Sequence, residues 1–339
     1  MRRREFLAAS TAAAQSASRL RIGFLGAAHS HARDKIEIAR TSPDWELAGL
    51  WEPGDKVRAV YEKLGVPTTT REALLGDATI QVIAVESEVK PHASLAMMAL
   101  DAGKHVHLEK PPSDNMADMR KLSALAKSKG LLLQMGYMWR FHPGINTAIE
   151  AARKGVLGDV FLVRGTMNTL IGPDRRPEWA LFKGGQMFEQ GCHLIDPMIR
   201  LLGAPIKIAP FLRHHGIYPD GLADNTVAVF EFPRAIGVIC SSVLHPGATA
   251  HRCFEIFGSN GSAVVKPLEP KPVLVVDLAR PAGPYRQGTQ TVTLPEFTRY
   301  TGDFRELADA VRNRKPLSVR LEEDLLVQEA LLRASEMWV

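Results

Sequence analysis

The chain has 339 residues, of which 45% are hydrophobic and 23% are charged, as in soluble globular proteins with room for two domains. Residues 1–19 carry +3 of the net charge of +5, so residues 20–339 carry only +2. No basic run with interleaved aromatic residues indicates a nucleic-acid groove, and no window approaches the about 18 apolar residues of a membrane span. Three cysteines are too few for a disulfide framework, and Cys240 and Cys253 are expected to be free thiols rather than a cross-strand pair.

The first 18 residues differ in kind from the rest of the chain. Arg3-Arg4-Glu5-Phe6-Leu7 resembles a twin-arginine export signature, and the small-residue run that follows is typical of a signal-peptide cleavage region. Because that run is short and weakly apolar, a basic N-terminal tail is the alternative reading. Two localisations stay open, periplasmic by twin-arginine export or cytoplasmic, and residues 1–18 are excluded from the predicted fold.

Residues 19–138 alternate predicted strands with predicted helices. Buried strands that alternate with helices predict an α/β domain with a parallel, doubly wound sheet, the Rossmann arrangement. The predicted strands are 20–26, 46–52, 80–85, 105–109 and 131–136, and the predicted helices lie around 36–39 and at 55–64, 91–102 and 113–130.

The turn after the first strand is where such sheets hold a dinucleotide. A G-x-G-x-x-G fingerprint would place glycines at three positions where the chain has Gly26, Ala28 and His31. The tight turn is kept, and Glu52 at the end of the second strand can accept a hydrogen bond from a ribose 2′-hydroxyl. Glu52 would repel a 2′-phosphate and we expect no arginine beside it, so NAD is favoured over NADP. His29 and His31 are expected at the helix N-terminus, where they could contact the pyrophosphate.

Two His-x-His pairs, His29/His31 and His105/His107, are spaced so that both rings of a pair could bind one metal ion. No cysteine or carboxylate cluster completes either set along the sequence. The sequence therefore predicts no metal site.

The stretch KHVHLEKPP at 104–112 ends a strand, at the edge where parallel sheets bind ligands. Lys110 precedes a proline, which biases its backbone to an extended conformation. Held in this way at the strand end, Lys110 could donate a hydrogen bond to a hydroxyl that reacts beside the nicotinamide. The alternative is an exposed loop lysine. The residues predicted to contact the cofactor are Gly26, Ala27, Ala28, His29, His31, Glu52, Val85, Glu86, His92, Glu109 and Lys110.

Residues 139–339 show a different pattern, in which turns rather than helices join most strands. This predicts a second, α+β domain with an open, mostly antiparallel sheet and two helices, 303–314 and 322–337, at the end of the chain. The predicted strands are 160–167, 206–212, 226–232, 236–243, 253–257, 263–266 and 273–277. The long polar loop 168–183, which contains Trp179, could line a substrate pocket or be an irregular surface loop.

The stretch GGQMFEQGCHLID at 184–196 carries the clearest candidate chemistry. At a helical period Glu189, His193 and Asp196 form a row beside an apolar stripe, and their i,i+4 and i,i+3 spacing lets the three side chains converge. An ordinary amphipathic helix with a solvated polar row is the alternative. Pro197 removes the N–H that would bond the His193 carbonyl, so the helix should kink there or begin anew with Asp196 as its cap.

These motifs resemble the Gfo/Idh/MocA family of oxidoreductases, from about residue 20 to the end of the chain. The similar segments are GFLGAAHSHA, the acidic Glu52, ALDAGKHVHLEKP, GGQMFEQGCHLID, FGSNGSAVV and FRELADAVRNRKPLS. The resemblance implies a Rossmann domain followed by an α/β domain whose open sheet often makes oligomer contacts, so a homo-oligomer, dimer or tetramer, is expected. It also implies that Lys110 is the active-site lysine and His193 the catalytic histidine.

The chain departs from the family pattern at several of these positions. Glu189 stands where many members have aspartate, Ala28 and His31 alter the phosphate turn, and Glu86-Ser87 replaces a Pro-Asn-type pair.

The resulting hypothesis is an NAD-dependent oxidoreductase that acts on a CH–OH group of a sugar, polyol or related compound. His193 would take the hydroxyl proton, since an imidazole pKa near 6.5 suits that role, Lys110 would bond the reacting oxygen, and Glu189 would orient the histidine. Arg140, Trp179 and Asp196 are candidates for substrate contact. The alternatives are a redox-neutral NAD-dependent glycosidase and a non-catalytic sugar- or cofactor-binding relative.

Overall fold

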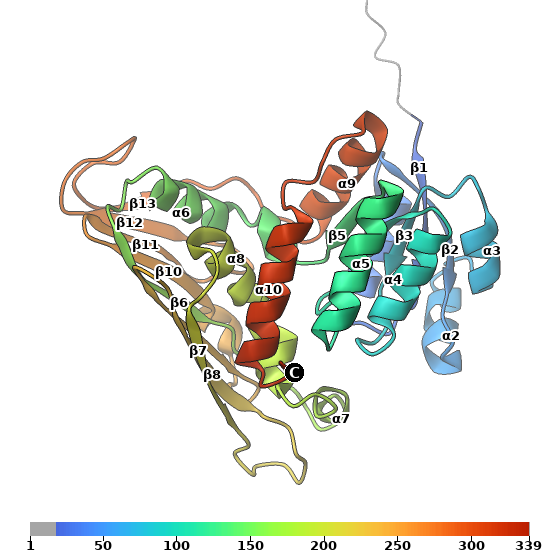
Figure 1. Cartoon of the computed structure of the whole chain (residues 1–339), viewed down its shortest axis with the longest axis horizontal. Helices are drawn as coiled ribbons and strands as arrows, with labels where there is room; N and C mark the ends of the chain where they lie inside the picture. Colours follow the sequence, from blue (N-terminus) through green and yellow to red (C-terminus); the bar gives the residue numbers. More distant parts are fainter. Residues whose placement is uncertain (1–17, 339) are drawn as a thin grey trace, which may run out of the picture.

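The computed structural model describes residues 18–338, so the predicted export signature lies outside the described residues. Two sheets dominate the fold: a compact sheet flanked by helices and a long open sheet, with α10 (Leu321–Ala334) between them (Figure 1). None of the described helices is long and apolar enough to cross a membrane.

The first sheet is wholly parallel, with strand order β2-β1-β3-β4-β5. Its central strands are buried on both faces, as expected when helices cover both sides. The predicted doubly wound Rossmann domain is thus confirmed; the short helix α3, which Thr70 caps, had no predicted counterpart. The elements are β1 (Leu20–Leu25), α1 (Ala32–Thr41), β2 (Trp45–Trp51), α2 (Asp55–Lys63), α3 (Arg71–Gly76), β3 (Val82–Val85), α4 (His92–Asp101), β4 (His105–Leu108), α5 (Met116–Lys129) and β5 (Leu133–Met135).

The second sheet has the order β13-β12-β11-β10-β6-β9-β8-β7. Only the β6–β9 pair is parallel, which confirms the predicted mostly antiparallel sheet. Helices α6 (Pro143–Arg153), α8 (Cys192–Leu202) and α10 lie on the face toward the first domain, and none of the described helices lies over the opposite face (Figure 1). The strands are β6 (Val160–Thr166), β7 (Lys207–Arg213), β8 (Asn225–Glu231), β9 (Ile236–Ser242), β10 (Cys253–Gly258), β11 (Gly261–Val265), β12 (Leu274–Leu278) and β13 (Gly288–Val292).

Helices and helical turns between the strands carry several candidate residues. The 3-10 turn η1 (Met138–Phe141) and α6 (Pro143–Arg153) follow β5, and α7 (Arg176–Trp179) lies within the long loop; a further 3-10 turn, η3 (Ala248–His251), precedes β10. A π-helical turn, η2 (Met187–Gly191), leads directly into α8 (Cys192–Leu202). The predicted new helix start at Asp196 is wrong. α8 begins at Cys192, directly after η2, and Pro197 lies inside it, where the His193 carbonyl loses the backbone N–H that would normally bond it.

The last part of the chain returns to the first domain. Helix α9 (Thr301–Asn313) packs Phe304 and Leu307 into the same apolar cluster as Ile22 and Trp45, and the indole N–H of Trp45 donates to the Phe304 carbonyl at 3.2 Å. One segment of the predicted second domain, 139–339, therefore packs on the first domain, namely α9. A sequence pattern alone cannot show this, because it does not reveal which sheet an amphipathic helix covers.

The described cysteines are free, as expected. Cys240 and Cys253 lie in strands on either side of β6, where both are in register with Thr166. Two strand spacings amount to about 9–10 Å, which is beyond the about 7 Å between Cα atoms that a disulfide can bridge.

Candidate active site

The carboxyl ends of β1, β3 and β4 define the crevice in which the candidate residues gather. The sheet order places β2 on one side of β1 and β3 on the other, so the connections leave in opposite directions from this point. Ligands of doubly wound sheets bind at such a switch point.

The turn after β1 keeps the shape needed to hold a pyrophosphate. Gly26 has φ +82°, and a Cβ added there would lie 2.6 Å from the Cα and Cβ of Ser87, so glycine is required. Within the described residues, the amides of Ala28 and Ser30 make no hydrogen bond, whereas those of Ala27, His29 and His31 are engaged. Two free amides beside the N-terminus of α1 fit an anionic group, as predicted for a dinucleotide.

Glu52 closes the outer end of this turn. Its Oε2 accepts from the Ala27 amide at 2.7 Å and its Oε1 from the Gly54 amide at 2.7 Å, and the residue is only 3% exposed. A carboxylate has about four lone-pair sites, so Glu52 can still accept ribose hydroxyls. The expectation that no arginine lies beside Glu52 is wrong, because Arg58, one helical turn into α2, donates to the Glu52 carbonyl at 3.0 Å.

A buried ionic cluster fills the floor of the crevice. The Lys35 ammonium donates to Glu86 Oε1 at 2.7 Å and to Glu109, and it lies 2.9 Å from His107 Nε2. Burial works against the charge on Lys35, but Glu109 and Glu86 more than compensate and raise the pKa of its ammonium. The sequence reasoning missed Lys35, although its position beside Ile36 on the inward stripe of α1 is a readable signal.

Lys110 reaches out of this cluster toward the second domain. Its Nζ donates to Glu189 Oε1 at 2.8 Å and to the Glu189 carbonyl at 3.2 Å, and both side chains are buried. Although burial opposes ionisation of Glu189, Lys110 and His29 lower the pKa of its carboxyl to about 2. Glu189 makes no hydrogen bond to His193, so the structure shows no contact through which it would orient or charge the histidine, and that role stays a prediction. The extra methylene of glutamate carries the carboxylate to Lys110, and no bond joins it to His193.

His193 is almost wholly buried, and neither of its ring nitrogens has a hydrogen-bond partner within residues 18–338. Its ring lies 5.4 Å from that of Trp139 and 6.0 Å from that of His31, measured between centroids. Burial, together with Lys110 and His31, holds the pKa of His193 well below its ordinary value. The imidazole is therefore neutral at neutral pH and able to accept a proton.

Two further buried donors that the sequence reasoning did not select also lack partners: Trp139, beside His193, and Tyr137, whose ring lies against the Arg140 guanidinium. The Tyr137 hydroxyl and the Trp139 indole N–H are buried and make no hydrogen bond within the described residues. A buried donor without a partner costs about 1–3 kcal/mol, so such groups are typical of sites completed by a ligand. Only their position, directly after a strand end of the sheet, signals them in the sequence.

His29 and His31 face the two carboxylates of the site. The amide of His31 donates to His29 Nδ1 at 3.2 Å, and His31 Nδ1 lies 3.1 Å from Glu109 Oε1; His29 Nε2 lies 3.6 Å from Glu189 Oε1. Glu109 thus supplies a carboxylate that the sequence did not place beside this pair, and ligand atoms of the three residues lie within 4.8 Å of one another. Because Lys35 already occupies the other oxygen of Glu109, a second cation there would meet its repulsion.

Comparison with known proteins agrees with this geometry. The family described as "Oxidoreductase family, NAD-binding Rossmann fold" (GFO_IDH_MocA) matches residues 20–137, and "GFO/IDH/MocA C-terminal domain" matches residues 145–264. The chain belongs to the Gfo/Idh/MocA oxidoreductase family. The resemblance inferred from the sequence motifs is confirmed.

Three Gfo/Idh/MocA-like proteins illustrate the range of relatives. dTDP-3,4-didehydro-2,6-dideoxy-alpha-D-glucose 3-reductase from Streptomyces violaceoruber is 28% identical over 305 residues, 86% of this chain and 85% of that protein. KijD10, a 3-ketoreductase from Actinomadura kijaniata in complex with TDP-benzene and NADP, has a TM-score of 0.78 at 21% identity, with 95% and 98% of the two chains covered. Aldose-aldose oxidoreductase from Caulobacter crescentus, complexed with glycerol, has a TM-score of 0.80 at 21% identity, with 94% and 98% covered. At these identities the structural matches establish the fold.

Two further residues predicted to contact the cofactor, His92 and Val85, make contacts within the loops and strands that form the crevice. His92 lies 2.8 Å from the Pro111 carbonyl through Nδ1 and 3.0 Å from the Ser87 carbonyl through Nε2, so it ties two crevice loops together. Val85 is buried in β3, and its carbonyl accepts from the Glu109 amide at 3.1 Å.

The three residues predicted to contact substrate lie apart from this cluster. Arg140 donates to Asp196 at 2.7 and 2.9 Å and to Asp324 at 2.6 Å, in a buried network. Trp179 is buried against Ile171 and other apolar residues. These contacts give Arg140 and Asp196 a structural role, and substrate contact for all three stays a prediction.

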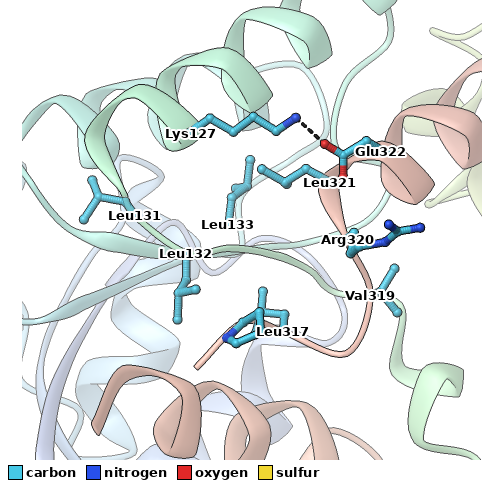
Figure 2. A pocket seen from close by; sticks show the side chains of 10 residues that line it. Lys127, Leu131, Leu132, Leu133, Leu317, Val319, Arg320, Leu321 and Glu322 are labelled. Atoms are coloured by element: carbon cyan, nitrogen blue, oxygen red, sulfur yellow. Dashed lines mark hydrogen bonds and ion pairs between the residues drawn. The ribbon is translucent and has the colours of Figure 1, made fainter. Parts of the chain in front are cut away.

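An apolar groove of about 200 Å³ lies at the opposite, amino-terminal edge of the parallel sheet. Figure 2 shows Leu131, Leu132 and Leu133 facing Leu317 and Leu321, with an ion pair between Lys127 and Glu322 across its rim. No predicted site residue lines it, so the groove is separate from the candidate active site.

Proposed function

We propose that this protein is an NAD-dependent oxidoreductase that acts on a CH–OH group of a sugar, polyol or related hydroxylated compound. One observation carries the proposal: Lys110, at the carboxyl end of a Rossmann strand, bonds to Glu189, and its charge lowers the pKa of buried His193, whose ring nitrogens have no hydrogen-bond partner among the described residues. A charged lysine and a neutral imidazole thus lie close together at the edge where a nicotinamide ring would bind.

The residues around the turn after β1 fit a dinucleotide. The turn at Gly26, the free amides of Ala28 and Ser30, and the start of α1 would hold the pyrophosphate, and Glu52 would accept from the ribose. A bound nicotinamide dinucleotide would supply the hydride acceptor.

The side chains around Lys110 and His193 would handle the substrate. Lys110 would donate to the oxygen that reacts, which lowers the energy of the developing carbonyl, and His193 would take the hydroxyl proton. The unpartnered donors of Trp139 and Tyr137 would bond neighbouring hydroxyls. Polyhydroxylated substrates are supported by the relatives named above, which include a reductase of a dTDP-sugar and an aldose oxidoreductase.

The test is to purify the full chain, identify any nucleotide that it retains, and assay sugars, polyols and aryl glycosides with NAD and with NADP. Net formation of reduced nicotinamide supports the dehydrogenase. Hydrolysis of an aryl glycoside without net reduction would support the redox-neutral glycosidase instead. Binding of nucleotide or sugar without turnover would favour the non-catalytic relative.

The preference for NAD rests on Glu52, and Arg58 is the residue that could weaken it. A carboxylate beside the ribose repels a 2′-phosphate, whereas an arginine attracts one. We expect Glu52→Ala to weaken NAD binding about tenfold and to narrow its advantage over NADP, measured by calorimetry. A wild-type protein that prefers NADP would overturn this part of the proposal.

Oligomerisation and export complete the proposal. The uncovered face of the second sheet exposes Phe211 and Ile236, which supports a homo-oligomer that light scattering would detect. Arg3-Arg4 supports twin-arginine export, and loss of periplasmic protein on changing both to lysine would test it.

A further inference from the structure

Lys35 connects three loops that come together only at the crevice. It lies on α1, directly after the phosphate turn, and its ammonium bonds Glu86 from the loop after β3 and Glu109 from the loop after β4. All three side chains are wholly buried. A single charged group therefore joins the loop after β1 to the two loops that face it.

The fold alone does not require a charge at this position. The neighbouring inward residues of α1 are Ala32, Ile36 and Ala39, and an apolar residue in their company would complete the stripe. Burying an ammonium is costly unless it is paired, and replacing buried ion pairs by apolar residues is often neutral for stability. The lysine is better explained by what its contacts hold in place.

Glu109 transmits the constraint to the reacting groups. Lys35 takes Glu109 Oε2, which leaves Oε1 to accept from the Lys110 amide at 2.9 Å and to contact His31 Nδ1 at 3.1 Å. One carboxylate thus sets the distance between the backbone of Lys110 and the phosphate turn. Without Lys35, that carboxylate would be buried with an uncompensated charge.

We propose that Lys35 is a positioning residue that locks the phosphate turn, the loop after β3 and the Lys110 segment into one rigid unit. The network also accounts for two departures from the family pattern, because His31 and Glu86 are both members of it. These residues compensate one another rather than weaken the site.

The direct test is hydrogen–deuterium exchange on the full chain, with Lys35→Ala compared with Lys104→Ala. Lys104 is also buried, but it lies at the amino end of β4, where it bonds the carbonyls of Asp77 and Ile80 at 2.6 and 3.0 Å. We expect Lys35→Ala to speed exchange about tenfold or more in all three crevice loops together, and Lys104→Ala to affect only its own edge. Unchanged crevice loops, or equal loosening by both variants, would overturn the proposal.

Chemical rescue separates a positioning charge from mere filling of space. Lys35→Ala leaves a cavity that n-propylammonium can enter, so added n-propylammonium should restore protection of the loops, whereas n-propanol, of similar shape, should not. Equal rescue by the alcohol would show that only volume matters. If Lys35→Ala does not fold, the double variant Lys35→Met/Glu109→Gln, which removes both charges, takes its place. It should fold and still show faster exchange in the crevice loops. Exchange as slow as in the wild-type protein would contradict the proposal.

A kinetic arm rests on the proposed function. With an identified substrate, kcat of Lys35→Ala should fall about tenfold and recover with n-propylammonium, while KM for the substrate stays close to the wild-type value. If the wild-type chain oxidises no sugar or polyol, the proposed function fails, and the exchange experiment still decides the positioning role.

Discussion

Two groups of side chains on η1 and α8 differ in whether their polar atoms have hydrogen-bond partners. Trp139 and His193 lie in η1 and α8 with ring nitrogens that have no hydrogen-bond partner among the described residues. Arg140 and Asp196, one and three residues further on, pair with each other, and Arg140 also pairs with Asp324. All of them are buried, so burial and polarity do not separate the two groups, whereas the use of their hydrogen-bonding atoms does.

The largest effect should come from Lys110, whose charge lowers the pKa of the unpartnered His193. Lys110→Met removes the donor to the reacting oxygen and leaves Glu189 buried without its partner, so we expect turnover to fall about thousandfold or more. The measurement is the rate of nicotinamide reduction at saturating substrate, with a melting curve to verify folding. Turnover within tenfold of the wild-type value would remove Lys110 from the proposed mechanism.

Arg140, from the group with partners, should affect stability instead. Arg140→Met leaves Asp196 and Asp324 uncompensated, which should lower the free energy of unfolding by about 3–5 kcal/mol. Chemical denaturation measures this change. The folded fraction should keep kcat within a few-fold of wild type; a loss as large as that of Lys110→Met would erase the distinction between the two groups.

His193→Asn should lower kcat about hundredfold with little change in unfolding free energy, because it removes a proton acceptor that makes no hydrogen bond in the protein. The pH profile sharpens this test. Since burial and Lys110 hold the pKa of His193 below its ordinary value, activity should persist as the pH falls through 6.5 before the acid limb begins. An acid limb centred on 6.5 would contradict the burial of this group in the active form.

Glu86 predicts a slope in stability above neutral pH. Burial, reinforced by Glu109 and opposed by Lys35, raises the pKa of Glu86 to about 8, above the about 4.3 of an unfolded glutamate. The stability that its proton contributes is fully present below the unfolded value and is lost as the pH rises to about 8. Between pH 7 and 8 the free energy of unfolding should fall by up to about 1.4 kcal/mol per unit, and Glu86→Gln should flatten this slope.

A second variant tests whether the slope above pH 7 belongs to Glu86. Burial raises the pKa of Asp303 to about 7, so Asp303→Asn should change the slope below pH 7 and leave the slope above it unchanged. Denaturant unfolding at several pH values would show both effects. A slope that survives in Glu86→Gln would assign the proton to another group.

Trp139 should give the smallest effect. Trp139→Phe keeps most of the ring against His193 and removes the indole N–H, which has no partner in the protein. Stability should change little, and KM for the substrate should rise about two- to tenfold, as expected for one lost hydrogen bond of about 0.5–1.5 kcal/mol. An unchanged KM would place Trp139 outside the substrate site.

The sequence predicted the order of elements and selected Lys110, Glu189 and His193 as candidate residues, because both depend on local pattern. The strand end at Lys110 and the helical spacing of Glu189 and His193 are such patterns. It could not show that Glu189 reaches Lys110 rather than His193, since that depends on how two domains meet. Lys35 escaped notice for a related reason: a lysine on an amphipathic helix is usually solvated, and only the approach of Glu86 and Glu109 makes its burial tolerable.

Helix α9 has a consequence for how the molecule can be divided. The backbone passes from the first domain to the second near residue 138, returns to the first domain at α9 and leaves it again for α10, so three covalent connections span the interface instead of one. A pair of domains tethered in this way cannot swing freely about a single point. A fragment that ends near residue 138 would leave Ile22 and Trp45 without the helix that covers them, so the nucleotide-binding half is not an independently excisable part.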